Sequence, residues 1–168
     1  MSAVANPLTA RIADFLNQIG IEVIPAPIDE PTFLPGIEVN HGRLLVDESR
    51  LKYPGDLLHE AGHLALAPAA MRGELSGEVN LPEENMDVIE VQAIAWSYAA
   101  LVYLKLEPEV VFHEEGYKGK SEALLLNFRS GFYLGATGLE AAGMTAMGQA
   151  AEDLGVPPYP HMLKWLKS

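Results

Sequence analysis

The hydrophobic pattern at the start of the chain predicts a helix and then a short strand. Apolar residues recur every three or four positions over residues 7–19, and Gly20 directly after them is a typical helix stop. Residues 21–24 are short and β-branched, which predicts a strand that Pro25 ends. Residues 25–35 are rich in proline and acidic side chains, so we expect a loop there.

The next segment predicts a β-hairpin that leads into a second helix. Strand-like runs flank the turn residues 40–42, so we expect a hairpin over residues 36–47. A helix is expected over residues 54–66. Pro54 suits its first turn, and Pro68 prevents it from continuing far.

The second half of the chain predicts helices. Residues 69–84 hold glycine, proline and acids, which is typical of a loop with at most one helical turn. Residues 86–106 form the longest apolar helical pattern, closed by Pro108. Glycines separate the shorter helical patterns that follow, which we expect over residues 109–114, 121–132, 145–154 and 160–166. Together these elements predict a mostly helical α+β fold with a small sheet near the N-terminus.

Length and composition favour one globular domain over residues 1–168. The chain carries 11 Lys+Arg and 23 Asp+Glu, which gives a formal net charge of −12. Such a surface repels phosphate, so we expect no direct nucleic-acid binding and no binding to anionic membranes. The absence of cysteine excludes disulfides and thiol chemistry.

We expect a cytoplasmic protein. The N-terminus lacks the basic and apolar regions of a signal peptide. The most apolar stretch, residues 91–106, is expected to be too polar and too short to span a bilayer. The sequence predicts no oligomeric state.

The strongest chemical motif is His59-Glu60-Ala61-Gly62-His63. On a helix, positions i and i+4 share one face, so both imidazoles can bind one Zn²⁺. Glu60 lies about a quarter turn away and can act as general base on water at the metal. Apolar neighbours argue against two unrelated solvated histidines, because buried imidazoles need partners.

A third ligand must come from elsewhere in the chain, and Glu90 is our choice. It lies near the start of the long helix among apolar or small residues, where an unpaired carboxylate is costly. The alternative ligands are Glu83, Glu84 and Asp87, and Asp87 could instead orient an imidazole. Two histidines and one carboxylate could also hold iron or manganese.

The order of these parts resembles the ImmA/IrrE family of bacterial zinc peptidases. The matching pieces are residues 42–47, then residues 56–63, then Glu90 with Ala93 and Trp96. The resemblance implies a zincin-like domain whose small antiparallel or mixed sheet packs on the active-site helix. It implies that His59, His63 and Glu90 are the ligands and Glu60 the catalytic acid/base. Residues 1–106 would then form the metal-site core and residues 107–168 a helical C-terminal extension.

The expected activity is hydrolysis of a peptide bond, in a specific protein such as a transcriptional regulator. An extended substrate could pair with the strand at residues 43–46. The candidates for a group that stabilises the oxyanion or supports a ligand are His113, Tyr117, Tyr98 and Tyr133, and Asp87 is a candidate supporting carboxylate. The alternatives are hydrolysis of a non-peptide amide and a zinc-binding regulatory or interaction module without a hydrolytic role. We expect Trp165 and Leu166 to fold back as an apolar anchor or to form a dimer contact.

Overall fold

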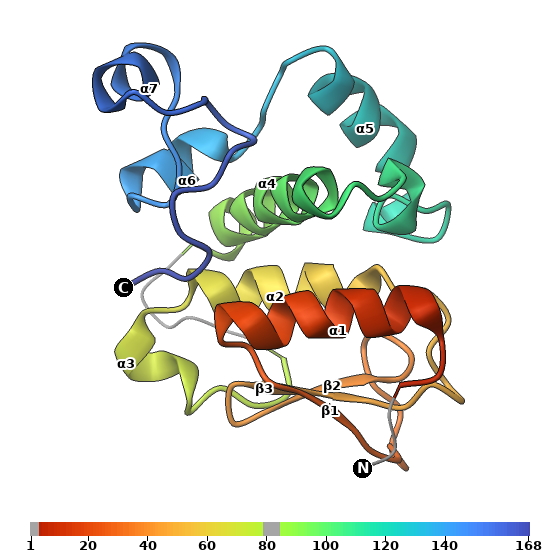
Figure 1. Ribbon diagram of the computed structural model, residues 1–168. Helices are drawn as coiled ribbons and strands as arrows, with labels where there is room; N and C mark the ends of the chain where they lie inside the picture. Colours follow the sequence, from red (N-terminus) through yellow and green to blue (C-terminus); the bar gives the residue numbers. More distant parts are fainter. Residues whose placement is uncertain (1–3, 79–84) are drawn as a thin grey trace.

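The computed structural model of the protein describes residues 4–78 and 85–168 (Figure 1). Its elements follow in the order α1 (Pro7–Ile19), β1 (Val23–Pro25), β2 (Ile37–Asn40), β3 (Arg43–Val46), α2 (Asp56–Leu66), α3 (Ala69–Arg72), α4 (Met86–Leu104), the 3-10 segments η1 (Pro108–Val110) and η2 (Tyr117–Gly119), α5 (Ser121–Arg129), α6 (Ala136–Ala141) and α7 (Gly148–Leu154). Over these residues the fold is α+β with a small mixed sheet, as the sequence predicts.

Helix α1 begins and ends at the residues that its sequence predicts. The Asn6 side chain accepts hydrogen bonds from the backbone N–H groups of Leu8 and Thr9, which caps the N-terminus. Gly20 adopts a left-handed conformation with φ of 101° and closes the C-terminus. The apolar face of α1 is buried and faces the core.

The sheet has the strand order β1-β3-β2, so β3 is its central strand. Strand β1 pairs with β3 in parallel, and β2 pairs with β3 in the predicted antiparallel hairpin. The turn between β2 and β3 uses positive φ at His41 (48°) and Gly42 (72°), the conformation that a two-residue hairpin favours.

This topology corrects the expectation that residues 43–46 pair with an extended substrate. Both edges of β3 are already occupied by neighbouring strands, so it has no free edge to offer. The edge strand of the hairpin is β2. Any strand addition on this side of the sheet must therefore occur at β2.

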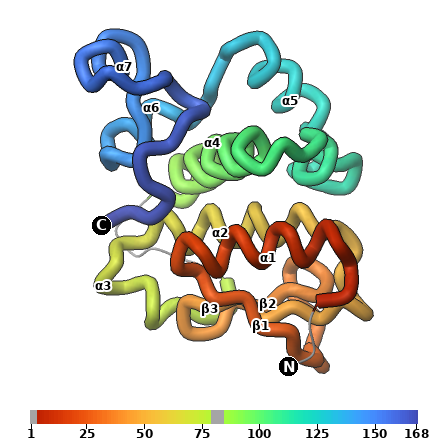
Figure 2. The backbone as a smooth tube through the Cα atoms, in the orientation of Figure 1, coloured from red at the N-terminus to blue at the C-terminus, as the bar shows by residue number. Residues whose placement is uncertain are grey.

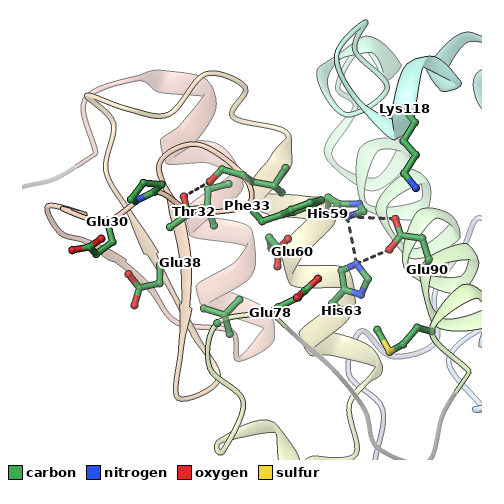
Figure 3. A pocket seen from close by; sticks show the side chains of 16 residues that line it. Glu30, Thr32, Phe33, Glu38, His59, Glu60, His63, Glu78, Glu90 and Lys118 are labelled. Atoms are coloured by element: carbon green, nitrogen blue, oxygen red, sulfur yellow. Dashed lines mark hydrogen bonds and ion pairs between the residues drawn. The ribbon is translucent and has the colours of Figure 1, made fainter.

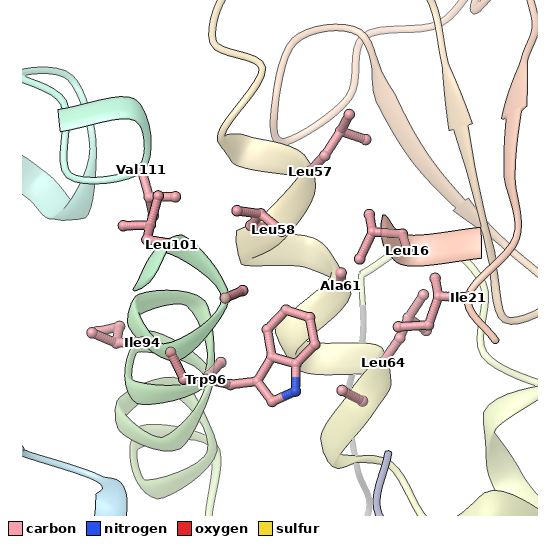
Figure 4. Close-up of a cluster of buried hydrophobic side chains, with 14 of the residues drawn as sticks. Leu16, Ile21, Leu57, Leu58, Ala61, Leu64, Ile94, Trp96, Leu101 and Val111 are labelled. Atoms are coloured by element: carbon pink, nitrogen blue, oxygen red, sulfur yellow. The ribbon is translucent and has the colours of Figure 1, made fainter. Parts of the chain in front are cut away.

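The centre of the core is the packing of α2 against α4 (Figure 4). Leu58 of α2 is fully buried and faces α4, whereas the fully buried Leu64 points to the other side, toward Ile21 (Figure 4). The two helices approach closely at Gly62, where an added Cβ would lie 3.1 Å from the carbonyl oxygen of Ala93. Small residues at this crossing therefore set the distance between the two helices.

Helix α4 is long and apolar enough to cross a membrane, by length and composition alone. The expectation of a segment too short and too polar considered residues 91–106, whereas the helix already begins at Met86. Half of its most apolar window is buried inside the protein, as in the core helix of a globular domain.

The C-terminal third differs most from the sequence prediction. The expected helix over residues 109–114 is only the 3-10 segment η1, and the helices over 121–132 and 145–154 are shorter than expected, as α5 and α7 show. No helix forms over residues 160–166, because Leu163 N–H and Lys167 N–H donate to carbonyls of other segments, at Met144 and Ala65. Helix α6 is not predicted, since its six residues include a glycine and only one large apolar side chain, Leu139.

The last residues of the chain fold back onto the core, as predicted for Trp165. The indole of Trp165 packs edge-on against Phe15, and its carbonyl accepts a 2.9 Å hydrogen bond from Trp96 Nε1. The Arg72 guanidinium donates to carbonyl oxygens in α2, in the residue after α2 and in Lys167. The C-terminal segment thus runs past α4 to the end of α2 (Figure 2).

Candidate metal centre

Helix α2 presents His59 and His63 on one face, as their spacing predicts. Their side chains are 12% and 9% exposed, and their Nε2 atoms lie 3.3 Å apart. The helix is held in this orientation by the buried apolar residues on its other faces. Both imidazoles therefore direct their Nε2 atoms toward one point.

Helix α4 brings Glu90 to that point (Figure 3). One carboxylate oxygen lies 2.9 Å from His63 Nε2 and the other lies 3.5 Å from His59 Nε2. The ligand atoms of the three residues all lie within 4.8 Å of one another, close enough to hold a metal ion. The structure thus brings together the three ligands that the sequence predicts.

The surroundings of the centre favour the metal-binding forms of His59 and Glu90. Burial, and then the neighbouring His63, lowers the pKa of His59 to about 4, so this imidazole is neutral at neutral pH. Burial alone would raise the pKa of Glu90, but the hydrogen bond with His63 and nearby positive charges, among them Lys118, lower it overall. A neutral imidazole and an ionised carboxylate are the forms that bind zinc, so the donor set fits the metal.

The pKa of His63 shifts in the opposite direction from that of His59. Burial alone would lower the pKa of its imidazole, but the hydrogen bond and charge of Glu90 raise it overall. Without a metal ion, His63 Nε2–H therefore donates to the Glu90 carboxylate at 2.9 Å. A metal ion must displace the proton of that hydrogen bond.

Glu60 lines the same cavity as the three ligands but does not belong to the ligand group. Burial raises the pKa of its carboxyl above the ordinary value. Its place on α2, one residue after His59, leaves it beside the ligands (Figure 3). This placement suits a group that exchanges protons with water near the metal.

The cavity around the centre has a volume of about 680 Å³. Its walls come from the loop before β2, the edge strand β2, helices α2 and α4, and Lys118. Phe33 stands in the loop wall and is 84% exposed. Sequence reasoning missed both Phe33 and Lys118, because neither belongs to a motif and only the fold places them here.

Several other candidate residues lie outside the cavity. His113 hydrogen bonds to Asp56 through a 2.7 Å contact and stacks on Tyr53. Tyr98 stacks on Phe128 with ring centroids 4.5 Å apart. The described residues that line the cavity do not include either of these candidates.

The remaining five candidates lie at different places in the fold or outside its described residues. Tyr133 packs against Tyr159. Asp87 is exposed on the first turn of α4 and is not part of the ligand group. The alternative ligands Glu83 and Glu84 lie outside the described residues. Tyr117 contacts a ligand, because its hydroxyl lies 3.1 Å from His59 Nδ1.

Comparison of the chain with protein-family models, with curated proteins and with solved structures finds no match. The resemblance to the ImmA/IrrE family therefore stays a prediction from motifs. The geometry defines a candidate His-His-Glu metal centre on an α+β fold.

Proposed function

We propose that the protein is a zinc-dependent metallopeptidase. The observation that carries this proposal is the convergence of His59, His63 and Glu90 in a cavity that Glu60 also lines. Three protein ligands with an accessible cavity are typical of a catalytic zinc site, whereas structural zinc sites are closed by four.

In the proposed reaction, three ligands hold the metal ion and Glu60 transfers the proton. A zinc ion held by the three ligands would supply Lewis acidity and lower the pKa of water. The Glu60 carboxylate accepts a proton from the attacking water and passes it to the nitrogen of the leaving amine.

The edge strand supports a peptide as the substrate. Ile37 N–H and Val39 C=O point away from β3, because they bond to Leu34 O and Gly77 N. Both backbone groups of a strand residue point the same way, so Ile37 C=O and Val39 N–H also face outward. An extended peptide could bond to these two groups while its scissile bond lies over the ligands.

We further propose a narrow range of protein substrates, such as a transcriptional regulator, and action in the cytoplasm. The net charge of −12 supports a protein partner over a nucleic acid. The exposed Phe33 at the cavity wall supports contact with an apolar side chain of that partner.

The substitution Glu60→Gln tests the proposal. We expect the variant to bind zinc like the wild type and to cleave a proteome-derived peptide library at least about 100-fold more slowly, since the proton acceptor is lost. The matched control is Glu38→Gln, which removes a carboxylate from the same cavity without touching the ligand group. Zinc content by mass spectrometry and cleavage by peptide sequencing give the two readouts.

Equal cleavage by Glu60→Gln and the wild type would contradict the assigned role of Glu60. Zinc binding without cleavage by any of these proteins would favour a regulatory module over a peptidase. Failure of the wild type to bind zinc would contradict the proposal at its first step.

A further inference from the structure

Residues 113–119, which follow α4 in the chain, bring Tyr117 and Lys118 close to the metal centre. Two contacts fasten this segment to the start of α2 and to the loop before it. His113 Nε2 lies 2.7 Å from Asp56 Oδ1, where both side chains are about one-tenth exposed. On the surface, Lys52 Nζ lies 2.6 Å from a Glu115 carboxylate oxygen. The segment is therefore fixed relative to the helix that carries the histidines.

The backbone of this segment takes an unusual course at its end. Tyr117, Lys118 and Gly119 have φ values of 53°, 54° and 79°, so three consecutive residues are left-handed. Left-handed backbone is unfavourable for tyrosine and lysine, and such strain is concentrated at functional sites. Here it directs the Tyr117 ring toward His59 and places Lys118 at the cavity wall.

The Tyr117 hydroxyl meets the back of a metal ligand. Its oxygen lies 3.1 Å from His59 Nδ1, the nitrogen opposite the one that faces Glu90. The two rings are nearly perpendicular, with a 74° interplanar angle. Burial raises the pKa of Tyr117, so the hydroxyl stays protonated and neutral.

We propose that Tyr117 is a positioning residue that fixes the tautomer and ring orientation of His59 for metal binding. In this arrangement His59 Nδ1–H donates to the Tyr117 oxygen, which leaves the lone pair on Nε2 free and directed toward His63 and Glu90. The inference rests on the proposed metal site and assigns its support to a residue far along the chain. A hydrogen bond to the second imidazole nitrogen is what orients histidine ligands in metal sites generally.

The other histidine shows that this support is specific to His59. His63 Nδ1 is buried and has no hydrogen-bond partner among the described residues. The tautomer of His63 is thus set on its Nε2 side by Glu90, whereas that of His59 is set from behind by Tyr117. This arrangement also separates Tyr117 from an oxyanion role, because its hydroxyl faces the back of His59 and Tyr117 does not line the cavity.

The substitution Tyr117→Phe tests the proposal through zinc affinity, measured by competition with a chromophoric chelator. We expect zinc binding about 10- to 100-fold weaker, the usual effect of losing such a supporting bond. The matched control is Tyr98→Phe, which removes a hydroxyl from the same aromatic cluster without contact to a ligand. The control should bind zinc like the wild type. Circular dichroism of the metal-free proteins checks that all three are folded.

A spectroscopic readout separates positioning from general structural support. Nitrogen-15 NMR of the metal-free wild type should show His59 as the Nδ1–H tautomer, and Tyr117→Phe should shift the population toward Nε2–H. Tyr98→Phe should leave it unchanged. An Nε2–H tautomer in the wild type, or unchanged zinc affinity in Tyr117→Phe, would overturn the inference. Failure of the wild type to bind zinc would instead overturn the proposed function, and the NMR result would still decide the tautomer.

Discussion

A single carboxylate, Asp47, fastens the loop that carries Phe33 to the end of the central strand. One of its oxygens accepts from Ile28 N–H at 3.0 Å, and the other accepts from the backbone and hydroxyl of Ser49. The hydrogen bond from the Ser49 hydroxyl, and then that from Ile28, lowers the pKa of Asp47. The carboxylate therefore stabilises the fold in its ionised form.

The substitution Asp47→Asn should make stability less dependent on pH. Because the pKa of Asp47 is lower in the folded state, its contribution is present above the unfolded value near 4 and is lost as the pH falls through the folded value. We expect a lower urea midpoint for the variant at pH 7 and a smaller difference from the wild type at about pH 3. Asp14→Asn, an exposed substitution on α1, is the control. A difference that stays constant over this pH range would contradict the assignment.

Some residues of the site could be predicted from the sequence around them, and others could not. His59, Glu60 and His63 could be predicted because helical spacing alone puts them on neighbouring positions. Glu90 could be predicted from its apolar surroundings, although its competitors remained open. Tyr117 is one of several candidates in the sequence, and no local pattern singles it out. Tyr117 and Lys118 reach the centre through positive φ angles and distant contacts.

At the scale of elements, the metal centre depends on the distance between α2 and α4. Each helix contributes ligands, and their backbones approach at Gly62 and Ala93. Ala93 is fully buried at this crossing. A larger side chain there would have to separate the helices or distort them.

The substitution Ala93→Leu should weaken both stability and metal binding. Overpacking of a buried position typically costs about 1–3 kcal/mol, and displacement of α4 would move Glu90 away from the histidines. Urea unfolding and zinc competition measure the two effects. Ala123→Leu, on the exposed face of α5, adds the same side chain without entering the core and should leave both unchanged. Wild-type zinc affinity in Ala93→Leu would show that the crossing does not set the ligand geometry.

Elements with strong periodic patterns and clear boundaries could be predicted, and those defined by contacts could not. The Asn6 cap and Gly20 mark the ends of α1, and the turn at residues 40–42 marks the hairpin. The segment over residues 160–166 has an apolar pattern of helical appearance. Its backbone bonds to distant carbonyls instead, and this tertiary preference overrides the local one.

At the scale of the whole molecule, the fold does not depend on the metal alone. The contact of α2 with α4 is an apolar core in which Leu58 and Trp96 are fully buried. The C-terminal segment adds a second connection, from Trp96 to Trp165. The proposed metal binding would therefore add stability to a fold that its apolar core already stabilises.

Removal of zinc should lower the melting temperature without unfolding the protein at room temperature. A metal present at about 1,000 times its dissociation constant stabilises by about 4 kcal/mol, which corresponds to roughly 10 °C for a domain of this size. Calorimetry with and without chelator, together with circular dichroism, measures this. The variant His63→Gln lacks a ligand and should show almost no chelator effect. An identical melting temperature of the wild type with and without chelator would contradict metal binding.

The short outer edge of β2 also bears on how copies of the protein behave at high concentration. Bonds to Leu34 and Gly77 occupy both ends of that edge, so the described residues leave room for only one residue's pair of backbone hydrogen bonds. A longer exposed strand edge would favour repeated strand pairing between molecules, which leads to fibrils. With this short free edge and a net charge of −12, β2 can bind one extended peptide and still resist strand stacking between copies at this edge.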